Sequence, residues 1–184
     1  FSYLTILADV ETQGFELDAN WMPPRIEGLS FRASLAYIEG EVADSNDVGL
    51  TFENEPFPLE GTGLDIPKWS YQLQTRYDRE IAGRFNSAFQ LDWSWRDDLC
   101  DRSEYVKTDN LTNYGIWCSS REGYGLLNAR ASIGSADGRW DIAIFGRNLT
   151  DEAYIINTTN DGVNGYLEQY GMPLTWGVEV GLSF

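Results

Sequence analysis

Polar and apolar residues alternate with a period of two through much of this 184-residue chain. In the segment 69–77, residues at odd positions, such as Trp69, Tyr71 and Leu73, are mostly apolar or aromatic, and those at even positions are polar. Successive side chains of an extended strand point to opposite faces, so this period indicates a different environment on each face. The pattern therefore predicts an all-β protein whose antiparallel strands have one apolar and one polar face.

The same alternation recurs along the chain, and the links between the alternating segments differ in length. The other alternating segments, which bring the total to about seven strands, are 15–21, 29–37, 84–95, 127–133, 140–147 and 174–184. Short turns are predicted at 23–28, 78–83 and 135–138, and links of more than about 20 residues at 40–68, 96–123 and 150–173. Since short and long links alternate strictly, all long links would lie at one end. Outer-membrane β-barrels have this arrangement, with short periplasmic turns and long extracellular loops.

The composition excludes several other classes of protein. Hydrophobic residues make up 42% of the chain, yet no window approaches the roughly 20 consecutive apolar residues that a transmembrane helix needs. A net charge of -16 argues against nucleic-acid binding, which requires Lys and Arg to neutralise phosphates. Histidine is absent, which removes the Ser-His-Asp triad and the usual zinc ligand sets. We therefore expect neither an enzyme nor a bound cofactor.

Two other architectures remain compatible with the alternation. A soluble secreted β-sandwich also alternates apolar and polar residues. A small structural or adhesive barrel of eight strands would use residues 1–7 as a short first strand. Charged residues within the polar faces favour a hydrated lumen over a sandwich: Glu16, Asp18, Arg76, Arg84, Asp92, Arg130, Arg147 and Glu179. The first ten residues lack the features of an export signal, so we expect a mature chain or a fragment.

The final third of the chain carries two motifs of fairly specific form. The segment 140–154 runs as an apolar strand into Asn148-Leu149-Thr150-Asp151 and then Tyr154, and it resembles the penultimate strand of TonB-dependent outer-membrane receptors. The segment 171–184 follows a Gly-x-Pro, alternates and stops at Phe184, like the family's last strand. It departs from the family in having Leu174 where Arg often follows the Pro. Two weaker likenesses lie at 13–17 and 66–69.

The resemblance implies a role in import. A member of this family has a 22-stranded barrel and an N-terminal plug, and residues 1–184 would be the C-terminal part of the barrel, without the plug. Implied partners are the rest of the barrel and its plug, the TonB complex reached through the plug, outer-membrane lipid and the barrel-assembly machinery. The substrate would be a small molecule or metal chelate, by default a ferric siderophore, with a saccharide or cobalamin also possible. The barrel-insertion signal would be Trp176, Val178, Val180, Leu182 and Phe184.

The long segment 96–123 holds the candidate ligand-binding residues. Cys100 and Cys118 are expected to form a disulfide, which stabilises such a loop by roughly 3 kcal/mol. Aromatic and cationic side chains in and beside the segment could grip a metal chelate or stack on sugar rings: Arg96, Tyr105, Tyr114, Trp117, Arg121 and Tyr124. The alternative is that they pack the loop and the membrane interface. Asp44, Asn46 and Asp47 lie close in sequence, but an ordinary turn accounts for them better than a calcium site.

Overall fold

Seven long antiparallel strands form one sheet in the computed structural model of the chain. The structure describes residues 8–45, 48–50, 56–58, 60–61, 63–64, 66–99, 105–107, 114–116, 121–160 and 166–183. The sheet has the order β1-β2-β5-β6-β9-β10-β13, so each strand pairs with the next long strand along the chain. The strands are β1 (Ala8–Trp21), β2 (Leu29–Ser45), β5 (Trp69–Ile81), β6 (Phe85–Arg96), β9 (Tyr124–Ser135), β10 (Trp140–Arg147) and β13 (Thr175–Leu182). The predicted number of strands is therefore confirmed.

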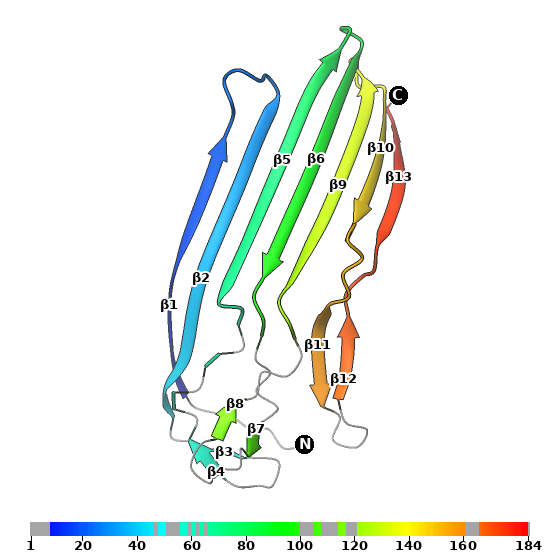
Figure 1. The fold of residues 1–184 in the computed structure, drawn as a ribbon. Helices are drawn as coiled ribbons and strands as arrows, with labels where there is room; N and C mark the ends of the chain where they lie inside the picture. Colours follow the sequence, from blue (N-terminus) through cyan, green and yellow to red (C-terminus); the bar gives the residue numbers. More distant parts are fainter. Residues whose placement is uncertain are drawn as a thin grey trace.

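The short turns and the long links lie at opposite ends of this sheet (Figure 1). The three links at the end that we call the loop end contain small two-stranded sheets of their own, which the sequence did not predict. These pair β3 (Val48–Leu50) with β4 (Pro56–Pro58), β7 (Tyr105–Lys107) with β8 (Tyr114–Ile116), and β11 (Ile155–Asn160) with β12 (Tyr166–Tyr170). We call the opposite end the turn end. In the described part of the chain, no helix is long and apolar enough to cross a membrane.

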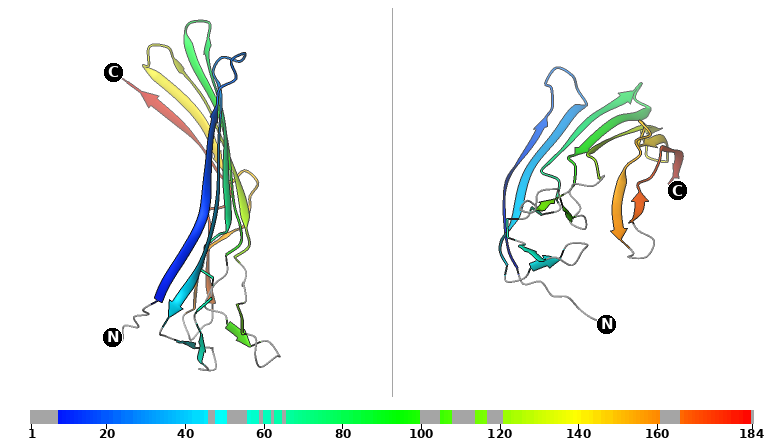
Figure 2. Two further views of the ribbon diagram at one scale, coloured as in Figure 1. Left: turned by 90° about the vertical axis from the view of Figure 1, so that its left-hand side faces the viewer. Right: turned by 60° about the horizontal axis from the view of Figure 1, so that its bottom comes forward.

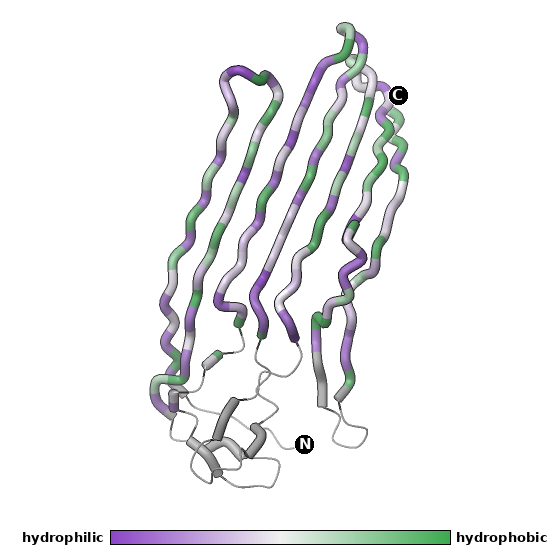
Figure 3. The backbone as a smooth tube through the Cα atoms, viewed as in Figure 1, coloured by the Kyte–Doolittle hydropathy of each residue, from purple (hydrophilic) through white to green (hydrophobic). Residues whose placement is uncertain are grey.

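The register of the strands keeps apolar side chains on one face. Leu73 of β5 lies opposite Ala33 on one side and Trp93 on the other, and Ile144 of β10 lies between Ala131 and Val178. Figure 3 shows the resulting alternation of hydropathy along each strand. Because directly paired residues share a face, the two faces predicted from the sequence are continuous across all seven strands.

The apolar face is exposed and no second sheet covers it in the described residues. Ile142 is 43% and Val178 58% exposed, although both lie within long strands. A β-sandwich would bury these side chains between two stacked sheets. The fold therefore contradicts the sandwich alternative. An apolar face that no other part of the described chain covers is expected of a surface that meets lipid.

The sheet is curved like a segment of a barrel wall, and the barrel is not closed (Figure 2). Its hollows are lined mainly by residues of the polar face, which is therefore the inner one. Few side chains are fully buried, because a single curved sheet has no core of its own; the described examples are Val42, Leu99, Ala143 and Asn148. This is the geometry of a barrel segment whose polar face lines a lumen.

Aromatic side chains form two bands on the apolar face. Toward the turn end, Trp21 stacks on Phe31 and Phe85 contacts Trp140. Toward the loop end, the contacts are Phe15 with Tyr37 and Trp69, and Tyr71 with Trp95.

The distance between the two bands fits the thickness of a membrane. From Phe85 to Trp95, β6 covers about 33 Å at roughly 3.3 Å per residue. A tilt of about 40° reduces this to about 25 Å, the height of the apolar band in outer-membrane barrels.

Four strands are longer than the alternation predicted. β9 extends over Tyr124–Ser135, beyond the predicted segment 127–133 at both ends. β1 begins at Ala8 rather than at residue 15, and β2 continues to Ser45, inside the predicted loop 40–68. β5 continues to Ile81 inside the predicted turn 78–83, so that the turn is tighter and contains Arg84. Ala82 and Gly83 form this turn with positive φ angles of 54° and 66°. In the added parts both faces are polar or mixed, and the period of two therefore gives no signal there.

Candidate functional site: the polar face and its loop end

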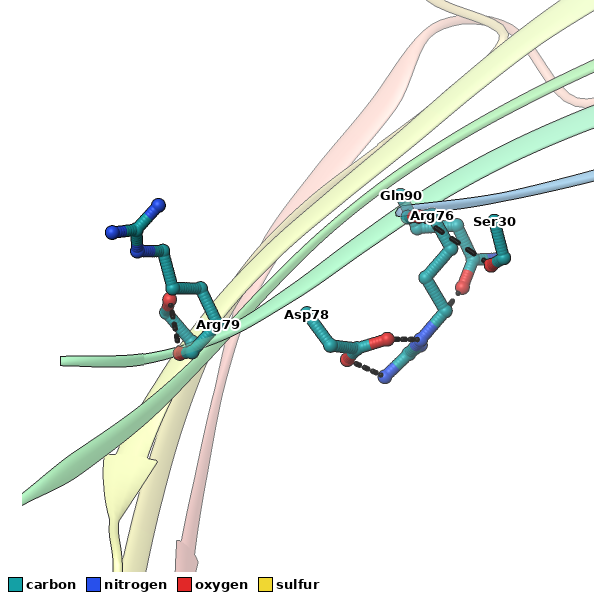
Figure 4. A network of polar contacts seen from close by, with 6 residues as sticks. Ser30, Arg76, Asp78, Arg79 and Gln90 are labelled. Carbon is teal, nitrogen blue, oxygen red and sulfur yellow. Dashed lines mark hydrogen bonds and ion pairs between the residues drawn. The ribbon is translucent and has the colours of Figure 1, made fainter. Parts of the chain in front are cut away.

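Polar side chains on the inner face are connected across β5 and β6 by hydrogen bonds. Arg76 donates two hydrogen bonds to the carboxylate of Asp78, at 2.8 and 2.7 Å, and one to Gln90 Oε1 at 3.1 Å (Figure 4). Gln74 and Gln90 both donate to Asp92, at 2.7 and 2.9 Å. A bidentate pair of this kind fixes both side chains. The middle of the inner face is thus an ordered polar surface.

A second group of contacts continues this surface over β9, β10 and β13. Arg130 forms an ion pair with Glu179 at 2.7 Å, above Ala143, which is only 1% exposed. Phe145 breaks the polar pattern, and the guanidinium of Arg147 lies 5.6 Å from its ring centre. The ring is accommodated because Gly177 opposite has no side chain; an added Cβ would lie 2.7 Å from the Phe145 Cζ. The small residue at 177 is therefore explained by packing against Phe145.

A hollow of about 420 Å³ lies on the inner face near the loop end. That volume is in the range of small-molecule sites, which run from about 300 to 1,000 Å³. Carboxylates, hydroxyls and an amide contribute to its lining, as do one guanidinium and one phenol: Glu16, Asp18, Ser34, Ser70, Gln72, Ser94, Arg96 and Tyr124. These side chains come from five neighbouring strands, so the register of the sheet sets their spacing. We call this cavity the loop-end hollow.

Arg96 and two tyrosines form a stack at the edge of the loop-end hollow that is nearest the long links. The guanidinium of Arg96 lies 4.5 Å from the ring centre of Tyr124, and the Tyr124 and Tyr154 rings are 4.3 Å apart. Arg96 also donates a hydrogen bond to the carbonyl oxygen of Ile155 at 3.4 Å. Gly171 lies against the Tyr154 ring so closely that no Cβ would fit there. The stack therefore ties the base of the β11–β12 hairpin to β6 and β9.

Asn148 explains why the Asn-Leu-Thr-Asp sequence has a fixed form. Its side chain is 3% exposed and exchanges hydrogen bonds with the backbone of Glu152, and it also donates to the Met172 carbonyl at 3.1 Å. Its own N–H donates to Asn128 Oδ1 at 2.9 Å. The Asp151 carboxylate accepts from the Leu174 N–H at 3.0 Å. These contacts join the end of β10 to β9 and to the segment before β13, which makes the motif a structural lock.

One ion pair lies on the outer face just beyond the aromatic band. Lys68 Nζ is 2.7 Å from Glu39 Oε1, and Tyr37 donates a hydrogen bond to the same carboxylate at 3.0 Å. The hydrogen bond to Glu39 raises the pKa of Lys68. Both partners are well exposed, so the pair contributes little to stability.

Only part of the predicted ligand-binding set can be located. Arg96 and Tyr124 lie together at the loop-end hollow, and Arg121 pairs through its backbone with Leu99 at the root of the same link. Tyr105 and Tyr114 belong to β7 and β8, but their side chains are outside the described part, as is all of Trp117. The sequence did not identify Tyr154 as a partner of Tyr124. Nothing in the alternation signals a contact between residues 30 positions apart.

The remaining predicted sites divide between described and undescribed residues. Cys100, Cys118 and Phe184 lie outside the described residues, as do Asn46 and Asp47. Trp176, Val178, Val180 and Leu182 occupy the apolar face of β13, but their role in insertion is untested and stays a prediction. Within the described ranges, no group of three or more His, Cys, Asp or Glu could hold a metal ion.

The fold and the inner face define a class of protein: an antiparallel transmembrane β-barrel segment with an apolar outer face and a hydrated, polar lumen. The chain belongs to the TonB-dependent receptor family, since the family model described as "TonB dependent receptor-like, beta-barrel" matches residues 1–182. No curated protein and no solved structure shows significant similarity to it. The family is one of bacterial outer-membrane barrels that take part in TonB-dependent transport together with a plug and TonB.

Proposed function

We propose that this chain forms the C-terminal part of a barrel that imports a scarce nutrient across the outer membrane with energy from TonB. The observation that carries the proposal is the lining of the loop-end hollow, where carboxylates, a guanidinium and a tyrosine ring meet on the inner face of a membrane-barrel segment. A ferric siderophore is the first candidate substrate, and a saccharide or cobalamin is the alternative. The chemistry is binding and passage, with no covalent step.

The proposal assigns roles to particular parts of the chain. Arg96 and Tyr124 bind the ligand from the edge of the loop-end hollow, and the ring of Tyr124 offers a surface for stacking. Tyr105, Tyr114, Trp117 and Arg121 belong to the same proposed binding loop. A disulfide between Cys100 and Cys118 would restrain that loop, and the terminal strand would be recognised by the assembly machinery. A plug and the remaining strands would complete the barrel.

Uptake measurements in a deletion strain test the proposal. The complete gene is deleted and restored, and uptake of radiolabelled ferric chelates, oligosaccharides and cobalamin is compared in the two strains. We expect the deletion to abolish uptake of one of these classes. In the restored strain, Arg96→Ala should lower that uptake about tenfold, as expected for the loss of a contact worth roughly 1.4 kcal/mol.

A matched control separates a local effect from a general one. Arg139→Ala removes a guanidinium of the opposite, turn end, where the Arg139 side chain forms an exposed ion pair with Asp137. It should leave uptake unchanged. If no class of substrate depends on the gene, or if both arginine variants behave alike, the loop-end hollow is not the ligand site.

A further inference from the structure

The described residues at the loop end carry a strong negative charge, whereas the rest of the sheet is neutral. The links at the loop end, with the strand ends that they join, comprise segments 1–13, 38–68, 97–123 and 148–174. The described residues of these segments comprise 12 acidic and 3 basic residues, a net charge of -9. The remaining residues, which form the spanning parts of the strands and the short turns, hold 9 acidic and 9 basic residues and are neutral.

Where the structure describes them, some of these carboxylates are opposed to one another. Glu11 of β1 lies directly opposite Glu41 of β2, on the outer-face side of these strands, and Asp9 lies opposite Asp44. All four side chains are exposed. Like charges in directly opposed cross-strand positions destabilise a sheet. These two opposed pairs therefore cost folding free energy.

The charged side chains of the loop-end hollow favour a cation over an anion. Elsewhere on the inner face Arg76 is engaged by Asp78 and Arg130 by Glu179, whereas Arg32 contacts Asn20 and Arg147 contacts the Phe145 ring. The charged residues that line the loop-end hollow are Glu16, Asp18 and Arg96, so the hollow is itself net negative. In the described part of the chain, Glu16 and Asp18 have no basic partner, whereas Arg96 is covered on one side by Tyr124. An entering ligand thus meets an acidic rim and then an acidic cavity.

We infer that the transported ligand is a small molecule or metal chelate with a net positive charge; this inference rests on the proposed transport function. The acidic loop end attracts such a ligand and repels anions, and Glu16 and Asp18 supply the opposite charge in the loop-end hollow. Clefts lined by charge of one sign raise association rates by a factor of about 10 to 1,000, and salt screens the effect within about 8 Å at physiological ionic strength. The preference is therefore one of ligand charge, and it holds for any chemical class of ligand.

Ligand series with a cationic, a neutral and an anionic member test the inference in cells that carry the complete gene. The ferric chelates are ferrioxamine B, which is cationic, its neutral N-acetyl derivative and its anionic N-succinyl derivative. The saccharides are glucosamine oligomers, their N-acetylated forms and galacturonate oligomers, and the third series is cobalamin with a cationic, neutral or anionic substituent on the ribose. In whichever series is transported, we expect the cationic member to be taken up fastest, and its advantage to shrink as salt is added.

Charge-neutralising variants then locate the effect. The triple variant Glu11→Gln, Glu41→Gln and Asp44→Asn relieves opposed charges and should therefore remain folded. It should lower uptake of the cationic member about threefold at low salt. The matched control neutralises three carboxylates of the turn end: Glu27→Gln, Glu80→Gln and Asp137→Asn. It should have no effect.

The possible outcomes separate this inference from the proposed function. If no series is taken up, the proposed function fails and the inference fails with it. If a series is taken up but its neutral or anionic member is preferred, the transport function stands and the inference alone is overturned. The inference is also overturned if the loop-end triple variant slows the cationic and neutral members equally.

Discussion

Asn148 shows how one buried side chain fixes the path of three segments. Its amide makes three hydrogen bonds to backbone groups of Glu152 and Met172, and its backbone adopts a positive φ of 51°. Asn tolerates this left-handed conformation better than most residues because its short side chain bonds locally. The two properties together explain why an Asn suits this position. The Asn-Leu-Thr-Asp motif, by which the sequence resembles the family, thus has a physical cause.

Replacement of Asn148 by Ala should destabilise the folded barrel by roughly 2–4 kcal/mol. The change removes three hydrogen bonds to backbone groups of Glu152 and Met172, and it places at a positive φ an Ala, whose side chain cannot bond locally as that of Asn does. Asn148→Gly loses the same hydrogen bonds, but Gly tolerates the positive φ. It should therefore be about 1 kcal/mol more stable than Asn148→Ala. Urea-unfolding midpoints in lipid vesicles measure both values. Thr150→Ala, at an exposed position of the same motif, is the control. Equal unfolding midpoints for Thr150→Ala and Asn148→Ala would contradict the structural role assigned to Asn148.

At the scale of single elements, the alternation located the spanning part of each strand but not the strand ends. Leu73, Trp93 and Ile144 were correctly placed on one face because lipid and water impose different residues on the two faces. β1 and β2 continue to pair beyond that region, where Glu11 faces Glu41 and both faces meet water. A period of two reports a difference between two environments, and backbone pairing does not require one. The ends of these strands were therefore invisible in the sequence.

Two neighbouring positions of β5 test which face meets lipid. Leu73 lies on the apolar face between the aromatic bands and is 50% exposed, and Gln72 lines the loop-end hollow on the inner face. Leu73→Arg should cost about 2–4 kcal/mol, since a charge is placed in the apolar part of the bilayer, while Gln72→Arg should cost at most about 1 kcal/mol. Unfolding titrations in vesicles give both values. Equal costs would mean that the two faces meet the same solvent.

At the scale of the whole molecule, topology was easier to predict than the site. The order of short and long links was enough to place all long links at one end, and the family motif at 140–154 fixed the order of the last strands. The site depends on contacts that join distant segments, such as Tyr124 with Tyr154 and Arg96 with the Ile155 carbonyl. These contacts are set by the curvature of the sheet and by the path of the link after Asn148. Neither property has a periodic signal in the sequence.

The separation of neutral and acidic ends also makes the orientation of the protein testable. Short turns face the periplasm and long loops the exterior in outer-membrane barrels, so the acidic loop end should be exposed outside the cell. Gly61 in a long link and Gly138 in a short turn are matched insertion sites, because both have positive φ and an added Cβ meets nothing within 4 Å. A short epitope placed after Gly61 should bind antibody on intact cells, and one placed after Gly138 should bind only after the outer membrane is permeabilised. Labelling of the Gly138 epitope on intact cells would reverse the orientation, and the acidic end could then no longer select the incoming ligand.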